Sequence, residues 1–212
     1  MQSAQLPDHI VYSPAVIEFV TVAAETCLFL EQATEQPRAD FIQTAVKILP
    51  LLYLKASVLQ IPESVFDDAS ERFVTEDDYL FVKEQVEQLL GADDSYLEVF
   101  HPDMALSDTP IAAFISEDLA DVYQEIKDFA ANYQTMDADI MNDALVCCLE
   151  AFGGHWGQKN LNALKALHAI RYSDSFNKED ESEGAQQKLN RNSFLQFLNN
   201  EEDENENDKL LY

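Results

Sequence analysis

The segment from residue 14 to residue 33 most limits what this chain can fold into. Ser13 and Pro14 are typical of a helix start, because a serine hydroxyl caps the first turn and proline fits its first position. The residues that follow are apolar nearly all round the helix, so it has to be buried on most of its sides. We therefore expect it at the centre of a helical bundle. Glu18 and Glu25 within it make a membrane span unfavourable.

The rest of the body also follows a helical pattern, and glycine and proline are scarce, at 5 and 7 of 212 residues. A second helix is predicted from Pro37 to about Gln60. Pro50 inside it predicts a kink rather than two helices, because no capping residue precedes it. The later helices are predicted at 75–90, 116–134, 138–152 and 157–171, and Thr75 and Ser116 are the predicted N-caps of the first two of these. Irregular connectors are predicted at 61–74 and 92–114, and a break between helices is predicted at Gly153–Gly154. We expect a single all-α bundle of five to six helices over residues 1–172, with the first two helices mostly buried.

Residues 173–212 differ in composition from the body. They hold 11 acidic and 4 basic residues and end in EEDENENDKLLY, so we expect a flexible acidic tail. One stretch, 189–198, is a short amphipathic element at helical spacing. Its apolar residues Phe194, Phe197 and Leu198 are candidates for docking in a groove of the body or of a partner.

The charge excludes whole classes of partner. Asp and Glu number 40 against 13 Lys and Arg, giving a formal net charge of −27, which repels phosphate backbones and anionic lipids. We therefore expect neither nucleic-acid nor membrane binding. Residues 63–103 are the densest stretch, with 13 acidic residues against Arg72 and Lys83. A basic protein surface is the partner that this charge favours, although acidic surfaces also simply keep proteins soluble.

The cysteines and the first residues indicate a compartment. A secretory signal needs a basic region before its apolar stretch, and the first Lys or Arg here is Arg38. Cys147 and Cys148 are adjacent and cannot join distant elements, while Cys27 lies in an apolar helix pattern. Reduced, buried thiols and a cytoplasmic location are the expectation.

One glycine-rich string is the main candidate for ligand binding. Gly153-Gly154-His155-Trp156-Gly157 holds the only tryptophan, and an exposed imidazole and indole there would bind a small ligand. The alternative is a tight corner between two helices, in which the glycines take left-handed conformations, Trp156 fills the core and His155 caps a helix end. Tyr96 and His101, in the second irregular stretch, are further ligand-binding candidates.

Carboxylates form a stripe on the predicted fourth helix. Asp118, Asp121, Glu125 and Asp128 share one side of the helix, where aligned carboxylates suit a hard cation such as Mg²⁺. A solvated charged face is the alternative. No catalytic residue set is identified and no cofactor is expected.

Three strings in register resemble a known family. These are YLEVFHP at 96–102, ISEDLADVY at 115–123, and HWG at 155–157 followed by ALKALH at 163–168. They resemble an uncharacterised bacterial all-helical family catalogued as a domain of unknown function, over roughly residues 14–172. The resemblance implies a helical bundle in the bacterial cytoplasm, and it implies no activity, cofactor or catalytic residue.

Two functions follow as expectations. The first is a non-enzymatic interaction or regulatory protein that uses the acidic surface. The alternative is a small-molecule-binding or metal-dependent enzyme centred on the His155–Trp156 corner and on Asp118 and Asp121. The sequence does not determine the oligomeric state. The apolar second helix has to be covered, and either the other helices of the chain or a second subunit would do this.

Overall fold

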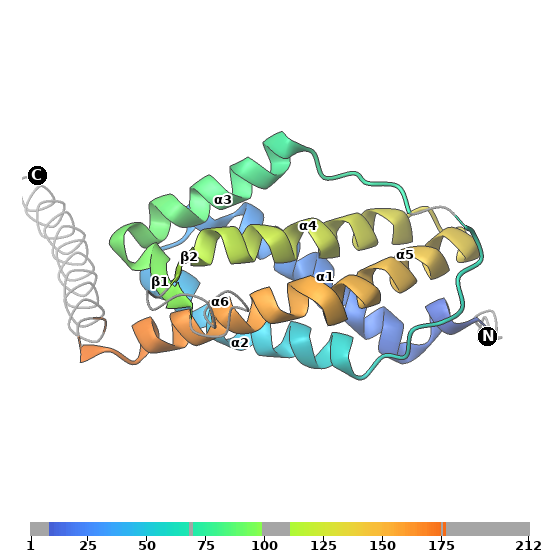
Figure 1. Cartoon of the computed structure of the whole chain (residues 1–212), viewed down its shortest axis with the longest axis horizontal. Coiled ribbons are helices and arrows are strands. Elements are labelled where there is room, and N and C mark those ends of the chain that lie inside the picture. Colours follow the sequence, from blue (N-terminus) through green and yellow to red (C-terminus); the bar gives the residue numbers. More distant parts are fainter. Residues whose placement is uncertain (1–8, 68–69, 99–110, 175, 177–212) are drawn as a thin grey trace, which may run out of the picture. The chain divides into compact units, whose positions relative to one another are not determined.

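A computed structural model describes residues 9–67, 70–98, 111–174 and 176 (Figure 1). Within this part of the chain the α-helices are α1 (Pro14–Glu31), α2 (Arg38–Ser57), α3 (Glu76–Leu90), α4 (Ile115–Tyr133), α5 (Ala138–Ala151) and α6 (Gly157–Arg171). Three short 3₁₀ turns, Ile10–Tyr12, Ala33–Glu35 and Gly91–Asp94, lie beside them. The predicted all-α bundle is confirmed. None of the described helices is both long enough and apolar enough to cross a bilayer.

A small sheet interrupts the second irregular stretch and was not predicted. Strand β1 (Ser95–Glu98) pairs antiparallel with β2 (Ile111–Phe114), and Ser95 lies opposite Phe114. The pair leads directly into α4, so it fixes β1 beside the first turn of that helix. Residues 99–110, which include His101, lie outside the described residues.

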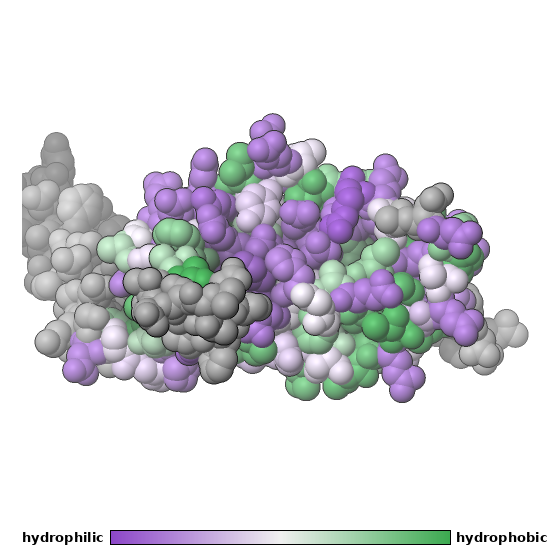
Figure 2. Space-filling model, viewed as in Figure 1, coloured by the Kyte–Doolittle hydropathy of each residue, from purple (hydrophilic) through white to green (hydrophobic). Residues whose placement is uncertain are grey.

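Helix α4 is the centre of the bundle, and the expectation that the first two helices are mostly buried is wrong. Helix α4 packs against α1, α3 and α5, and the Phe129 ring stacks on Phe19 of α1 with centroids 5.1 Å apart. Helix α1 buries one face only, since Ile17 and Leu28 on its other side are 37% and 47% exposed. The apolar outer face is compatible with solvent because folded proteins leave much apolar surface exposed. Figure 2 shows further green apolar areas at the surface along the lower edge of the view, near α2.

Helix α2 runs through Pro50 without dividing. It extends from Arg38 to Ser57 as one helix, as the missing cap before Pro50 predicts. Leu49 and Leu52 point into the core, whereas Leu51 and Leu54 on the outer side are 41% and 54% exposed.

The helix ends show which capping predictions hold. Thr75 forms a capping box with Asp78 at the start of α3, and Gly91 with φ 57° ends that helix. The predicted cap at Ser116 is wrong, because α4 begins one residue earlier, at Ile115. Ser116 instead donates its backbone N–H and its hydroxyl to the buried Asp94 carboxylate, each at 2.7 Å. A carboxylate from the preceding segment therefore serves as the cap.

The predicted break at Gly153–Gly154 is also wrong. Residues Phe152–Trp156 form a π-helical turn that carries α5 on into α6, as Figure 1 shows. Among the described glycines only Gly91 has a positive φ, so neither Gly153 nor Gly154 takes a left-handed conformation. Trp156 is fully buried and donates its indole N–H to the Cys148 carbonyl at 2.8 Å, so its predicted place in the core is confirmed.

A second unit begins at Arg171, after the first unit ends at Ile170. In its described part the Arg171 guanidinium lies over the rings of Tyr172 and Phe176, 5.6 and 4.8 Å from their centroids. Phe194, Phe197 and Leu198 lie outside the described residues.

Candidate functional site

A cavity of about 470 Å³ lies beside the strand pair, where β1 and β2 meet the first turn of α4 and the start of α6. Its polar lining comes from three elements that are distant in the sequence. These polar residues are Tyr96 and Glu98 of β1, Glu117 and Asp118 of α4, and His155, Gln158, Lys159 and Asn162 around the start of α6. The strands and Gly154 supply the remaining, mainly apolar, wall.

An ion-pair network joins α6 to α4 at the floor of this cavity. The Lys159 ammonium donates to Asp118 Oδ1 at 3.0 Å and lies 3.1 Å from Asp121 Oδ2. Asp118 is 2% exposed, and its other oxygen accepts the Tyr96 hydroxyl hydrogen bond. Tyr79 of α3 donates to Asp121 Oδ1 at 3.0 Å, so the two aspartates each bridge two elements.

The strand side of the cavity is held by an amide. Asn162 donates its side-chain N–H to Glu98 Oε2 at 2.5 Å, and the Tyr96 hydroxyl lies 3.5 Å from the same oxygen. Glu98 is 9% exposed, so its carboxylate is placed at the cavity wall by neighbours from β1 and α6.

His155 lies at the mouth of the cavity. Its Nε2 is 3.8 Å from Asp121 Oδ2, and its side chain is 52% exposed. The neighbouring Gly154 faces open space, since a methyl group added there would meet no atom within 4 Å.

Burial and hydrogen bonds shift the pKa of Lys159, Tyr96 and Asp118 in this network. Burial alone lowers the pKa of Lys159, but its hydrogen bonds to Asp118 and Asp121 outweigh this, and the net pKa is raised. Burial is the main cause that raises the pKa of Tyr96, and its hydrogen bond to Asp118 adds to it. Burial also raises the pKa of Asp118, although the hydrogen bonds from Tyr96 and Lys159 oppose that shift. A charged lysine and a neutral tyrosine are suited to binding rather than to nucleophilic attack.

The structure brings together several of the predicted ligand-binding and metal-binding residues, but not all of them. Tyr96, His155 and Asp118 line one cavity, and Asp121 contacts His155 and Lys159 of its lining. Trp156 points into the core and does not line it.

Lys159 and Asn162 line the candidate site and were not predicted from the sequence. A signal for them exists in the sequence, because His155, Gln158, Lys159 and Asn162 follow the i, i+3, i+4, i+7 spacing of one helical face. The apolar residues that predict α6, such as Ala163 and Leu167, lie on the opposite side of that helix.

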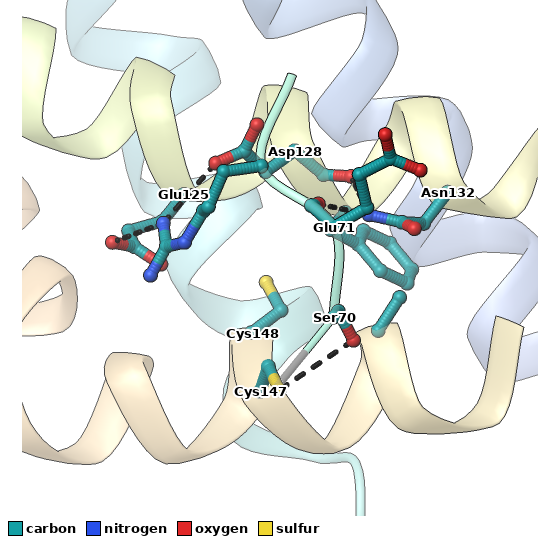
Figure 3. A pocket seen from close by; sticks show the side chains of 10 residues that line it. Ser70, Glu71, Glu125, Asp128, Asn132, Cys147 and Cys148 are labelled. Carbon is teal, nitrogen blue, oxygen red and sulfur yellow. Dashed lines mark hydrogen bonds and ion pairs between the residues drawn. The ribbon is translucent and has the colours of Figure 1, made fainter. Parts of the chain in front are cut away.

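The carboxylate stripe of α4 divides between two places. Asp118 and Asp121 hold Lys159, whereas Glu125 and Asp128 hold Arg72, at 3.0 and 3.1 Å. Figure 3 shows Glu125 and Asp128 around a small cavity of about 50 Å³, with Cys147 and Cys148 of α5 on its other side. In the described part of the chain, no three His, Cys, Asp or Glu side chains are grouped so that they would hold a metal ion.

Two carboxylates clasp the connector between α2 and α3 onto the bundle. Asp128 accepts the backbone N–H groups of Phe73 and Val74 at 2.7 and 2.8 Å. Asp143 of α5 accepts those of Val65 and Phe66, both at 2.7 Å. A segment without helix or strand therefore finds acceptors for its backbone in buried side chains.

Two of the three cysteines, Cys27 and Cys148, are buried thiols. Burial raises the pKa of the Cys148 thiol well above its ordinary value, and it raises that of Cys27 to about 12. Cys147 accepts a long hydrogen bond from the Ser70 hydroxyl, at 3.6 Å. Protonated thiols are poor nucleophiles, so the buried Cys27 and Cys148 act as small apolar side chains.

Comparison with known proteins places the chain in a family. The model of a family described as a domain of unknown function, DUF5063, matches residues 10–173. Among solved structures, the chain is similar to the crystal structure of protein BF1032 from Bacteroides fragilis, a structural genomics target, with 46% sequence identity. The match has a TM-score of 0.69 and covers 77% of this chain and 96% of that chain. A search of curated proteins gave no match. The resemblance predicted from the sequence is thereby confirmed, and the chain belongs to the DUF5063 family, a domain of unknown function.

Proposed function

We propose that this chain is a non-enzymatic regulatory protein that binds a small polar molecule in the cavity between β1, β2, α4 and α6. The observation that supports the proposal is the convergence of Tyr96, Asp118, His155, Lys159 and Asn162 on one hollow. Its volume of about 470 Å³ lies within the roughly 300–1,000 Å³ of small-molecule sites.

The electrostatics favour binding over proton or group transfer. Lys159 is held as a cation by two carboxylates, which removes it as a nucleophile near neutral pH. Tyr96 is held as a neutral donor to Asp118, so neither Lys159 nor Tyr96 supplies a nucleophile near neutral pH.

The charge around the cavity selects the ligand. Glu98, Asp118 and Asp121 outnumber the single ammonium of Lys159, and the whole chain carries a formal charge of −27. Anions are therefore disfavoured, and hydroxyl-rich neutral molecules or small organic cations fit best.

The proposed setting is the bacterial cytoplasm. Cys27, Cys147 and Cys148 are all free thiols, which is typical of reducing compartments. The similarity to a protein of Bacteroides fragilis supports a bacterial source.

A thermal-shift screen tests the proposal. Sugars, polyols, amino acids and polyamines are added to the full chain, and a ligand at about 100 times its Kd stabilises the folded state by about 2.7 kcal/mol. For a chain of this size this raises Tm by roughly 5–10 °C.

A matched pair of variants locates the binding. Gly154→Leu places a side chain in the cavity, because Gly154 lines it and faces open space. Gly153→Leu is the control, since it also meets no atom within 4 Å and belongs to the same π turn. We expect the ligand-induced shift to vanish in the first variant and to persist in the second. A shift that survives Gly154→Leu, or a panel without any shift, would contradict the proposal.

A further inference from the structure

The outward face of α3 combines exposed apolar side chains with carboxylates. Val82, Val86 and Leu90 turn into the core, while on the other side Leu80 and Phe81 are 39% and 55% exposed. In Figure 2 green apolar areas over α3 are enclosed by purple hydrophilic ones. The fold of its own chain therefore leaves more than half of Phe81 exposed.

Three carboxylates around this pair have no cation of their own in the described part of the chain. Glu76, Asp77 and Glu84 are exposed and form no ion pair there, whereas Lys83 is used by Glu117 at 3.3 Å. Glu76 and Asp77 favour the start of α3 through its helix dipole. Glu84 lies beyond the first turn, so its charge does not interact favourably with the helix dipole. Its carboxylate is therefore available to pair with a cation of another molecule.

The helix geometry puts the charges on both sides of the apolar pair. Asp77 precedes Leu80 and Phe81 by about one turn, and Glu84 follows them by about one turn. Seven residues at about 1.5 Å each separate the two carboxylates by about 10 Å along the axis. A plain solubilising surface explains the acids, but it does not explain an exposed phenyl ring between them.

We propose that this face, defined by Asp77, Leu80, Phe81 and Glu84, docks a basic amphipathic segment of a partner protein. The segment packs one apolar anchor on Leu80 and Phe81, and its lysines or arginines reach Asp77 and Glu84. The net charge of −27 steers a cationic segment toward the molecule and repels an anionic one. This surface does not depend on the ligand cavity proposed above.

The test uses a fluorescein-labelled helical peptide with a leucine pair flanked by lysines one turn away on each side. Its Kd is measured by fluorescence anisotropy against the full chain. A second peptide replaces the leucines by serines and keeps the charge. The first peptide is expected to bind at least about fivefold more tightly, because the apolar anchor carries a large part of such interfaces.

Variants separate this face from the diffuse charge of the whole protein. Phe81→Ser is compared with Leu54→Ser, which removes a side chain of equal exposure, 54%, from α2. The charge pair Asp77→Asn and Glu84→Gln is compared with the single Glu25→Gln, an exposed carboxylate of α1. Phe81→Ser and the α3 charge pair should each raise Kd at least about fivefold, and the controls should change it less than twofold.

Equal weakening by Phe81→Ser and Leu54→Ser, or equal binding of the two peptides, would overturn the proposal. All changed residues are exposed, and circular dichroism with the unfolding midpoint verifies that each variant is folded.

Discussion

Replacing Asp143 by alanine should release one end of the connector between α2 and α3. The Asp143 carboxylate accepts hydrogen bonds from the backbone N–H groups of Val65 and Phe66, from the Ser64 hydroxyl and from the Asn142 amide, at 2.7 to 3.0 Å. Hydrogen bonds to a charged acceptor contribute about 1.5–3 kcal/mol each in favourable cases. Val65 and Phe66 are half exposed, so water replaces part of what is lost. We expect a net cost of about 2–3 kcal/mol.

The expected effect is local and is read by amide hydrogen exchange. A cost of about 2.7 kcal/mol corresponds to roughly a hundredfold loss of protection at Val65 and Phe66. Phe73 and Val74, which Asp128 holds, provide the internal control. The reciprocal variant Asp128→Ala should expose Phe73 and Val74 and leave the Asp143 end protected. Equal loss at both ends in either variant would refute two independent clasps.

The same clasp has a pH dependence with a defined sign. Burial raises the pKa of Asp143, but the hydrogen bonds from Val65, Phe66, Asn142 and Ser64 outweigh it, and the net pKa is lowered in the folded state. A lowered pKa stabilises the fold above the pKa of the unfolded chain, about 4, and that contribution is lost as the pH falls through the folded value. Protection at Val65 and Phe66 should therefore decrease below about pH 4 in the native chain, and Asp143→Ala should lack this step.

Two further results are expected. Gly157→Ala should lower the free energy of unfolding, measured by urea denaturation, by about 1–3 kcal/mol, because its added carbon would lie 2.5 Å from the Phe152 carbonyl oxygen. Gly153→Ala meets open space and should raise that free energy by up to about 1 kcal/mol. Equal effects of the two variants would contradict this account of the π turn. Burial raises the pKa of Tyr79, Tyr96 and Tyr123, whose hydroxyls donate to carboxylates, so their stabilising contribution is present below about pH 10 and is lost as the pH rises further. Absorbance at 295 nm should show these three among the eight tyrosines ionising only as the chain unfolds, and reversible ionisation of all eight near pH 10 without unfolding would disprove it.

Local signals in the sequence predicted the helices well. Ser13 before Pro14, Thr75 with Asp78, and Gly91 mark helix ends that the structure confirms, because capping depends on neighbours within a few residues. Ser116 failed as a cap because the acceptor for its N–H is Asp94, which lies 22 residues earlier. Spacing along one helix carries no information about such a partner.

The candidate site was predictable only in part for the same reason. The carboxylate stripe of α4 was visible from the helical period, but the period does not show what faces it. Asp118 meets Lys159, and Glu125, two turns on, meets Arg72. One stripe therefore belongs to two places, and the cavity exists only because β1, β2 and α6 meet at its first turn.

The buried carboxylates change what the acidity of the chain means. Asp94, Asp128 and Asp143 each accept two backbone N–H groups or an N–H and a hydroxyl, although each is less than 9% exposed. A carboxylate offers two oxygens to neighbouring N–H groups, so it holds an irregular segment that no helix or sheet can satisfy. Part of the negative charge of the helical body is thus required by the fold. The exposed Glu84 of α3 has no such duty among the described residues, and it is this kind of remainder, rather than the total of −27, that a partner would recognise.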